Sequence, residues 1–190
     1  MGSFRLDRQT TDVKTTAVVR TDLDGYEDEL RALLVDYFVE ANEQGRAWFD
    51  DEEFGASPEE IVAADLERLA SATIEKPLFL ALHREKRTEE KPAGSIQLKR
   101  LDETTAEVKR LYVRPSYRGR GIGRELVESL LAAARADGFE TLRLGVAPYH
   151  ESARSLYGEL GFEFTPAYDE SHAPAEIRDD WGFMKRSLTE

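Results

Sequence analysis

The fold is decided by one stretch, Glu107-Val-Lys-Arg-Leu-Tyr-Val-Arg-Pro-Ser-Tyr-Arg-Gly-Arg-Gly-Ile-Gly-Arg-Glu-Leu-Val-Glu-Ser-Leu-Leu-Ala-Ala-Ala-Arg-Ala-Asp137. Its first residues are typical of a short strand that runs to Val113. Pro115 ends the strand because proline has no N–H to donate to a ladder. From Ile122 onward, apolar residues recur at helical spacing until Gly138. The stretch therefore predicts a strand, a glycine-rich turn and a helix.

The turn between strand and helix combines arginines with glycines: Arg118, Gly119, Arg120, Gly121, Gly123 and Arg124. Free backbone N–H groups, a helix N-terminus and guanidinium groups would then face one place, which predicts a phosphate-binding site. An ordinary tight turn before a helix is the alternative. No Gly-Lys-Ser/Thr follows, and the glycines lack G-x-G-x-x-G spacing, so neither a P-loop nor a dinucleotide fold is indicated.

Composition limits the class of protein. The 190 residues form one expected domain, 1–190, with a loose segment at 1–14, and they include no Cys. The absence of Cys excludes disulfides and thiolate ligands and fits a cytoplasmic protein. No apolar run is long enough to span a bilayer, and the first residues do not resemble a signal peptide.

Net charge argues against some partners. A formal charge of −12 disfavours nucleic acid and anionic membranes, which attract basic proteins. Basic residues at 109–124 form a local positive region that suits a polyphosphate ligand. The acidic residues 50–53 favour either a solvated loop or the rim of a site for a cationic acceptor, and salt adaptation explains the acidity equally well.

Apolar periodicity predicts alternating helices and strands around this centre. Helices are expected at 24–44, 58–72, 122–137 and 153–160, with Asp24 and Ser57 as the first two caps. Strands are expected at 15–20, 77–83, 93–101, 105–113, 141–146, 162–165 and 181–188. A hairpin loop at 84–91 and a long loop at 166–180 complete the chain. The β-α-β order makes strands 105–113 and 141–146 parallel.

Two motifs carry a family resemblance. Arg118-x-x-Gly121-x-Gly123 resembles the acetyl-CoA pyrophosphate motif of the GNAT N-acetyltransferase superfamily, and Ala153-Arg-Ser-Leu-Tyr-Gly-Glu-Leu-Gly-Phe162 resembles its second signature. The resemblance implies an α/β GNAT-like fold. Such a fold has a central, mixed, twisted sheet of about seven strands, flanked by helices, with a splayed pair of parallel strands.

The resemblance also implies where acetyl-CoA binds. Backbone groups of the central strand would pair with pantetheine, and the turn would hold the pyrophosphate. His150 stands where the family often has Asn, so it would donate a hydrogen bond, act as a base or lie on the surface. The implied cofactor-binding residues are Leu111, Tyr112, Val113, Arg118, Gly119, Arg120, Gly121, Ile122, Gly123, Arg124, His150 and Ala153.

Two residues are catalytic candidates by the same resemblance. Glu107 occupies the place of a general base that works through water, with a solvated strand residue as the alternative. Tyr157 matches the tyrosine that protonates the departing thiolate, with a core tyrosine as the alternative. No metal site is expected, because His83 has no His or Cys at metal spacing.

The predicted function is transfer of an acetyl group from acetyl-CoA to a primary amine. Without Cys, direct attack in a ternary complex is favoured over a covalent relay. The expected acceptor is a small molecule. A protein N-terminal or lysine acetyltransferase and a non-catalytic acyl-CoA-binding sensor are the alternatives, and the sequence leaves a homodimer open.

Overall fold

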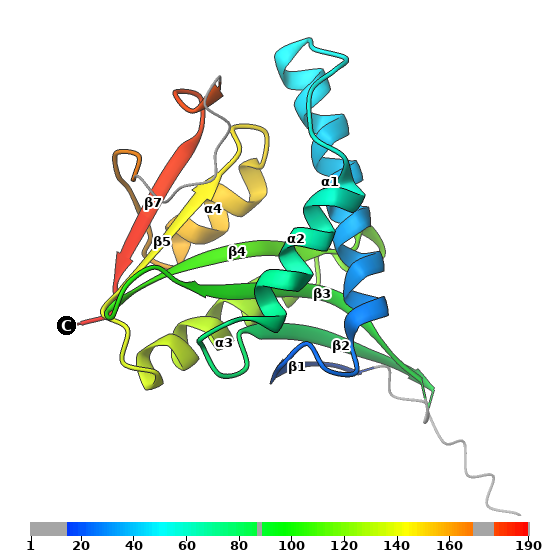
Figure 1. Ribbon diagram of the computed structural model, residues 1–190, viewed down its shortest axis with the longest axis vertical. Coiled ribbons are helices and arrows are strands. Elements are labelled where there is room, and N and C mark those ends of the chain that lie inside the picture. Colours follow the sequence, from blue (N-terminus) through cyan, green and yellow to red (C-terminus); the bar gives the residue numbers. More distant parts are fainter. Residues whose placement is uncertain (1–14, 87–88, 169–176, 190) are drawn as a thin grey trace, which may run out of the picture.

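The computed structural model describes residues 15–86, 89–168 and 177–189, and these residues form a seven-stranded sheet (Figure 1). Antiparallel pairing joins all neighbours except β4 and β5, which are parallel. Across the sheet the order is β1 (Thr15–Thr21), β2 (Leu78–Lys86), β3 (Glu89–Arg100), β4 (Thr105–Val113), β5 (Thr141–Val146), β7 (Gly182–Ser187) and β6 (Glu163–Phe164). The mixed α/β architecture that the sequence predicts is confirmed.

Four helices cover the two faces of the sheet. Figure 1 shows α1 (Glu27–Phe49) and α2 (Pro58–Ala70) on the near face, and α3 (Ile122–Ala136) and α4 (Glu151–Glu159) on the far face. The apolar stripe of α3, which includes Leu126 and Leu130, is fully buried against the sheet. A second cluster joins α1 and α2 to the near face. No described helix is both long and apolar enough to cross a membrane.

The parallel strands β4 and β5 pair over a short distance and then separate. Pairing joins Thr105–Glu107 with Thr141–Arg143, and no described residue pairs the two strands beyond that point. A β-bulge follows on β4, where the register with β3 shifts and Arg110 takes a left-handed φ of 56°. Because Asp65 on α2 binds Arg110 at 2.5 Å, the bulge is held from the near face. The predicted splayed pair is thus present.

Two helix boundaries differ from the sequence predictions. Helix α1 continues past Gly45 to Phe49. Glycine is needed at this position for packing rather than to end the helix, because the aromatic ring of Phe54 occupies the place of a side chain. The C-cap of α1 is Asp50, in the left-handed conformation. The predicted cap Asp24 is also wrong: α1 begins after Tyr26, which provides no side-chain cap. The Ser57 cap is confirmed by its bond from the Glu60 N–H.

The hairpin predicted at 84–91 is present, but the predicted length of its loop is wrong. Strand β2 continues to Lys86 and β3 begins at Glu89, so most of the charged residues belong to the two strands. These strand ends were missed because their sequence is charged and has no apolar alternation. Most of the predicted loop at 166–180 and the predicted loose segment 1–14 lie outside the described residues.

Gly94 allows β3 to approach the end of β4, and its substitution tests this packing. A Cβ at Gly94 would lie 2.6 Å from the carbonyl oxygen of Tyr112, so Gly94→Ala should destabilise the fold by about 1–3 kcal/mol. Gly158→Ala is the control, because Gly158 lies in a helix with open space around it and should gain about 0.5–1 kcal/mol. Denaturant unfolding measures both. Equal unfolding free energies for the two variants would contradict this account.

Candidate functional site

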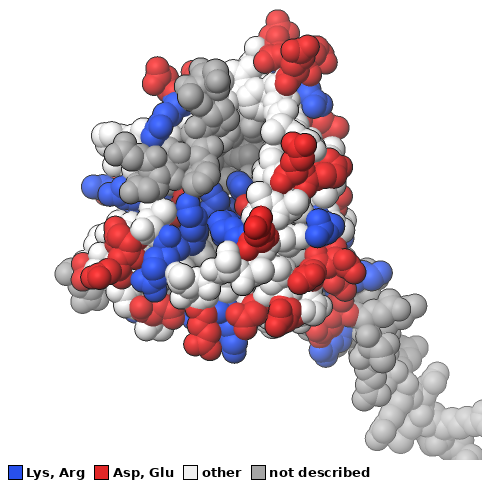
Figure 2. Space-filling model, in the orientation of Figure 1, with Lys and Arg blue, Asp and Glu red and all other residues white. Residues whose placement is uncertain are grey.

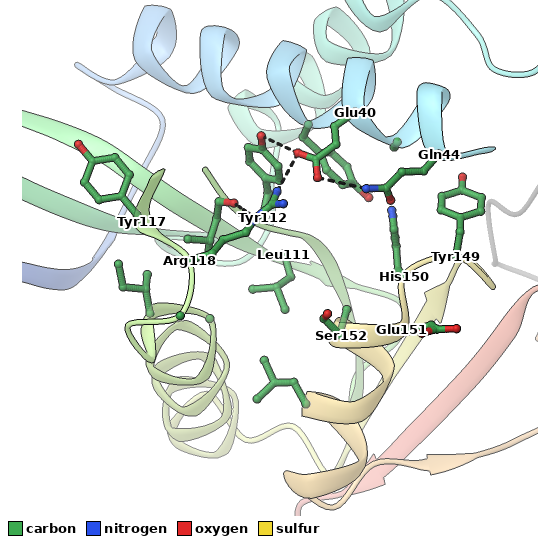
Figure 3. Close-up of a pocket in the computed structure, with 18 of the residues that line it drawn as sticks. Glu40, Gln44, Leu111, Tyr112, Tyr117, Arg118, Tyr149, His150, Glu151 and Ser152 are labelled. Atoms are coloured by element: carbon green, nitrogen blue, oxygen red, sulfur yellow. Dashed lines mark hydrogen bonds and ion pairs between the residues drawn. The ribbon is translucent and has the colours of Figure 1, made fainter. Parts of the chain in front are cut away.

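A cavity of ≈ 520 Å³ begins where β4 and β5 separate. Its walls come from α1 on one face of the sheet and from the first turns of α3 and α4 on the other (Figure 3). The last residues of β4 lie between these walls. Because both faces contribute, the cavity passes through the opening in the sheet.

The glycine-rich turn forms one end of the cavity. A short 3-10 turn (Pro115–Tyr117) leads into Gly119 and Gly121, whose φ angles of 73° and 81° favour glycine. Within the described chain, no acceptor meets the backbone N–H groups of residues 119–124, and the first helical bond of α3 is from Glu125 to Gly121. A helix N-terminus with free N–H groups favours a phosphate group.

The three arginines of the turn point in different directions. Arg118 lines the cavity and donates to the Val113 carbonyl at 2.8 Å. Arg120 donates to the Ser116 carbonyl at 3.0 Å, and Arg124 forms an ion pair with Glu159 on α4. The expectation that all three guanidinium groups face one place is therefore wrong for Arg120 and Arg124, and binding of phosphate by either stays a prediction.

Glu40 on α1 is a site residue that the sequence analysis missed. Its carboxylate accepts a bond of 2.7 Å from Arg118 and one of 3.2 Å from the Tyr112 hydroxyl. The bond from Arg118 lowers the pKa of Glu40, and burial acts in the opposite direction. The ion pair joins α1 to the turn across 78 positions of sequence. No local pattern could have revealed this contact.

His150 and an aromatic group form the other end of the cavity. The His150 ring lies 4.7 Å from that of Tyr149 and 6.2 Å from that of Tyr37. Burial lowers the pKa of His150 to about 4, so its imidazole is neutral at pH 7. Tyr149 also contacts Phe49 and Trp181 at ring distances of 6.4 and 6.3 Å. These aromatic side chains make the wall rigid and largely apolar.

Glu107 does not line this cavity. Its side chain is only 3% exposed, and its carboxylate accepts a bond of 2.9 Å from the Tyr168 hydroxyl. The ammonium groups of Lys109 and Lys99 lie 3.5 and 3.6 Å from it. The alternative of a solvated strand residue is therefore wrong, while the role of general base stays a prediction.

Tyr157 lies in the core beneath the cavity. Its ring is buried and packs edge-on against Phe162 at 5.4 Å, and burial raises the pKa of its hydroxyl far above the ordinary value. Its neighbours on α4, Ala153 and Leu156, do line the cavity. The ring of Tyr157 is therefore part of the core, as the alternative interpretation expected, and its role as general acid stays a prediction.

The cavity brings together most of the predicted cofactor-binding residues. The lining includes Leu111, Tyr112, Val113, Arg118, Gly119, Gly121, Ile122, Gly123, His150 and Ala153. The sequence analysis did not assign Tyr37, Glu40, Ala41, Gln44, Tyr117, Tyr149, Glu151, Ser152 and Leu156 to it. Four of these, from Tyr37 to Gln44, lie on α1 at helical spacing. Core residues show the same spacing, so this pattern could not identify them as cavity residues. In the described part of the chain, no cluster of His, Cys, Asp or Glu could hold a metal ion.

Fold and cavity together define an α/β protein in which a helix N-terminus with free N–H groups lies beside an opened parallel strand pair. The Acetyltransferase (GNAT) family model matches residues 27–162, which is more than half of the chain. The chain therefore belongs to the GNAT acetyltransferase family, as the two sequence motifs predicted.

Known relatives agree with this assignment. An IAA acetyltransferase of Azospirillum brasilense is 43% identical over 56 residues, which are 30% of this chain and 37% of that protein. The chain thus matches little more than a third of that relative's length. A GNAT-family acetyltransferase of Staphylococcus aureus Mu50 superimposes with a TM-score of 0.69 at 18% identity, covering 92% of this chain and 100% of that one. The PaiA N-acetyltransferase of Thermoplasma acidophilum, solved with coenzyme A, gives 0.60 at 17% identity, with coverages of 91% and 99%.

Proposed function

We propose that this protein transfers an acetyl group from acetyl-CoA to a small primary amine. The observation that carries the proposal is the run of free N–H groups at residues 119–124, which opens into a cavity that continues through the sheet. The helix N-terminus suits the pyrophosphate, and the cavity continues from it past the end of β4, where the pantetheine arm would lie. Family membership and the structure of PaiA with coenzyme A support the choice of cofactor.

The end of β4 would bind the pantetheine arm. Beyond Glu107, the edge of β4 that faces β5 is unpaired, so its backbone donors and acceptors are free to bind amide groups of a ligand. Leu111, Tyr112 and Val113 lie on this edge and line the cavity. A backbone N–H at the bulge would also polarise the thioester carbonyl and stabilise the oxyanion.

Acetyl transfer then needs an orderly movement of protons. The neutral amine attacks the thioester carbon, and the tetrahedral intermediate collapses as the bond from carbon to sulfur breaks. One proton leaves the amine nitrogen and one reaches the CoA thiolate. His150 lines the cavity as a neutral imidazole with a free lone pair, although its low pKa makes it a weak base at pH 7. Tyr157 would supply the proton to sulfur, because burial keeps its phenol protonated.

Substitution of Gly121 tests the cofactor site. Gly121→Leu should weaken CoA binding roughly 10- to 100-fold in calorimetry, because a side chain blocks the approach of phosphate to the N–H groups. Gly25→Leu is a matched control, since Gly25 has the same φ of 81° and equally open surroundings before α1. The control should bind CoA as the wild type does. A folded Gly121→Leu variant with unchanged affinity would refute the proposed CoA site.

Tyr157→Phe tests the proposed acid. The change keeps the ring that packs on Phe162 and removes only the hydroxyl, so kcat should fall about 10²- to 10⁴-fold with little change in Tm or CoA affinity. Tyr117→Phe, which removes a cavity hydroxyl at the phosphate end, should keep kcat near the wild-type value. A wild-type kcat in Tyr157→Phe would remove this residue from the mechanism.

Two other functions are distinguished by substrate. A protein N-terminal or lysine acetyltransferase would turn over peptides better than small amines. A non-catalytic sensor would bind acetyl-CoA tightly without releasing CoA on any acceptor. A CoA-release assay over a panel of amines and peptides, with calorimetry alongside, separates the three.

A further inference from the structure

A row of charged side chains crosses the sheet on the face that carries α1 and α2. Strand register places Lys99 beside Glu107, Glu107 beside Arg143 and Arg143 beside Lys185, and Glu163 of β6 follows beside Lys185. Partners in adjacent strands point to the same face, so the row is continuous across β3, β4, β5 and β7. Lys109, two positions along β4 from Glu107, joins it from the same face.

The cations of this row outnumber their carboxylate partners. Lys99 and Lys109 share Glu107 at 3.6 and 3.5 Å, which are long distances for ion pairs. Arg143 is half-buried, and no carboxylate of the described residues lies within ion-pair distance of it. Its guanidinium instead lies 5.3 Å from the ring of Tyr168. Among the described residues, the row therefore has four cations, Lys99, Lys109, Arg143 and Lys185, against the two carboxylates of Glu107 and Glu163.

A buried amide beside the row has an unused donor. Gln97 lies opposite Lys109 in the register of β3 and β4 and is fully buried. Its Oε1 accepts a bond from Arg68, but its Nε2 has no acceptor in the described part of the chain. Buried donors and charges without partners are unfavourable. In the described part of the chain, the row thus has more cations than carboxylates, and the amide beside it has a donor without an acceptor.

The surroundings of the row contrast with the rest of the surface. Figure 2 shows Lys and Arg gathered at the centre of this face, whereas Asp and Glu predominate around its edge. The whole chain carries a formal charge of −12. A local excess of cations in so acidic a protein attracts an anion to one place.

The row also lies at the right place relative to the proposed reaction. It lies at the last paired position before β4 and β5 separate, and Leu111 of the cavity is two residues beyond Lys109 on β4. Two residues of extended strand span about 7 Å, and the bulge at Arg110 makes this an upper limit for the separation of the two positions. This distance suits a small acceptor whose amine reaches the thioester while another group remains at the row.

We infer that the row binds an anionic group of the acceptor, which is therefore a primary amine that also carries a carboxylate or a phosphate. The inference rests on the proposed acetyl transfer. It differs from the cationic acceptor that the acidic residues 50–53 favoured, because those residues follow the end of α1, whereas the row lies where β4 and β5 separate. Glu107 then holds Lys99 and Lys109 in position.

Matched acceptors test the inference. Turnover would be measured for free amino acids against their C-terminal amides, and for phosphoethanolamine against ethanolamine. The anionic member of at least one pair should have the lower KM. A difference in the amino-acid pair indicates a carboxylate, and a difference in the ethanolamine pair indicates a phosphate. Loss of a charge-assisted contact in Arg143→Gln should raise the KM for that anionic amine roughly 10- to 100-fold. The KM values for its neutral partner and for acetyl-CoA should not change.

Two further variants control for charge and folding. Arg100→Gln removes the same charge next to Lys99, but Arg100 stacks on Phe139 in the cluster of the opposite face and should not alter the preference. Arg143→Lys keeps the positive charge, so this variant should retain most of the preference for the anionic amine that Arg143→Gln loses. Equal KM values within both pairs, or an Arg143→Gln variant with the wild-type preference, would overturn the inference while leaving acetyl transfer intact.

Absence of turnover on every amine would instead refute the proposed function. Calorimetric titration of CoA-saturated protein with the two amines of each pair then tests anion binding by the row independently of turnover. Tighter binding of the anionic amine than of its neutral partner, lost in Arg143→Gln, would support the anion site. Equal binding would overturn it.

Discussion

The separation of β4 from β5 is the constraint on which the other features of this structure depend. Backbone groups that would pair in a continuous sheet are left free beyond Glu107, and backbone polar groups need a hydrogen-bond partner. A ligand with amide groups would satisfy them, as the proposed binding of the pantetheine arm requires. The bulge at Arg110 maintains the opening, and the ion pair between Arg110 and Asp65 fixes the bulge from α2.

A second link makes the cavity a single unit. Glu40 binds Arg118 and Tyr112, and thus connects α1, the end of β4 and the glycine-rich turn. Since Arg118 also donates to the Val113 carbonyl, the turn is tied to the strand that precedes it. The turn and the end of β4 are therefore held together. In the proposed reaction, such preorganisation would favour the transfer geometry over other bound states.

Local sequence signals were sufficient for the fold but not for all of the site. The strand, turn and helix from 105 to 137 follow from period, proline and glycine, which act within a few residues. The ring of Phe54 against Gly45 and the bond between Glu40 and Arg118 depend on distant parts of the chain, so neither left a local pattern. Glu107 shows the same limit: its position on β4 was predictable, but its burial among Lys99, Lys109 and Tyr168 was not.

The central claim is that the opened strand pair and the turn at residues 119–124 together bind CoA. An NMR titration of ¹⁵N-labelled protein with CoA tests it most directly. The amides of Gly119, Gly121 and Gly123 should shift and saturate together with those of Leu111 and Tyr112, while the amide of Gly138, at the other end of α3, stays unchanged. Saturable shifts confined to other parts of the protein, or no shifts at high CoA concentration, would contradict the account.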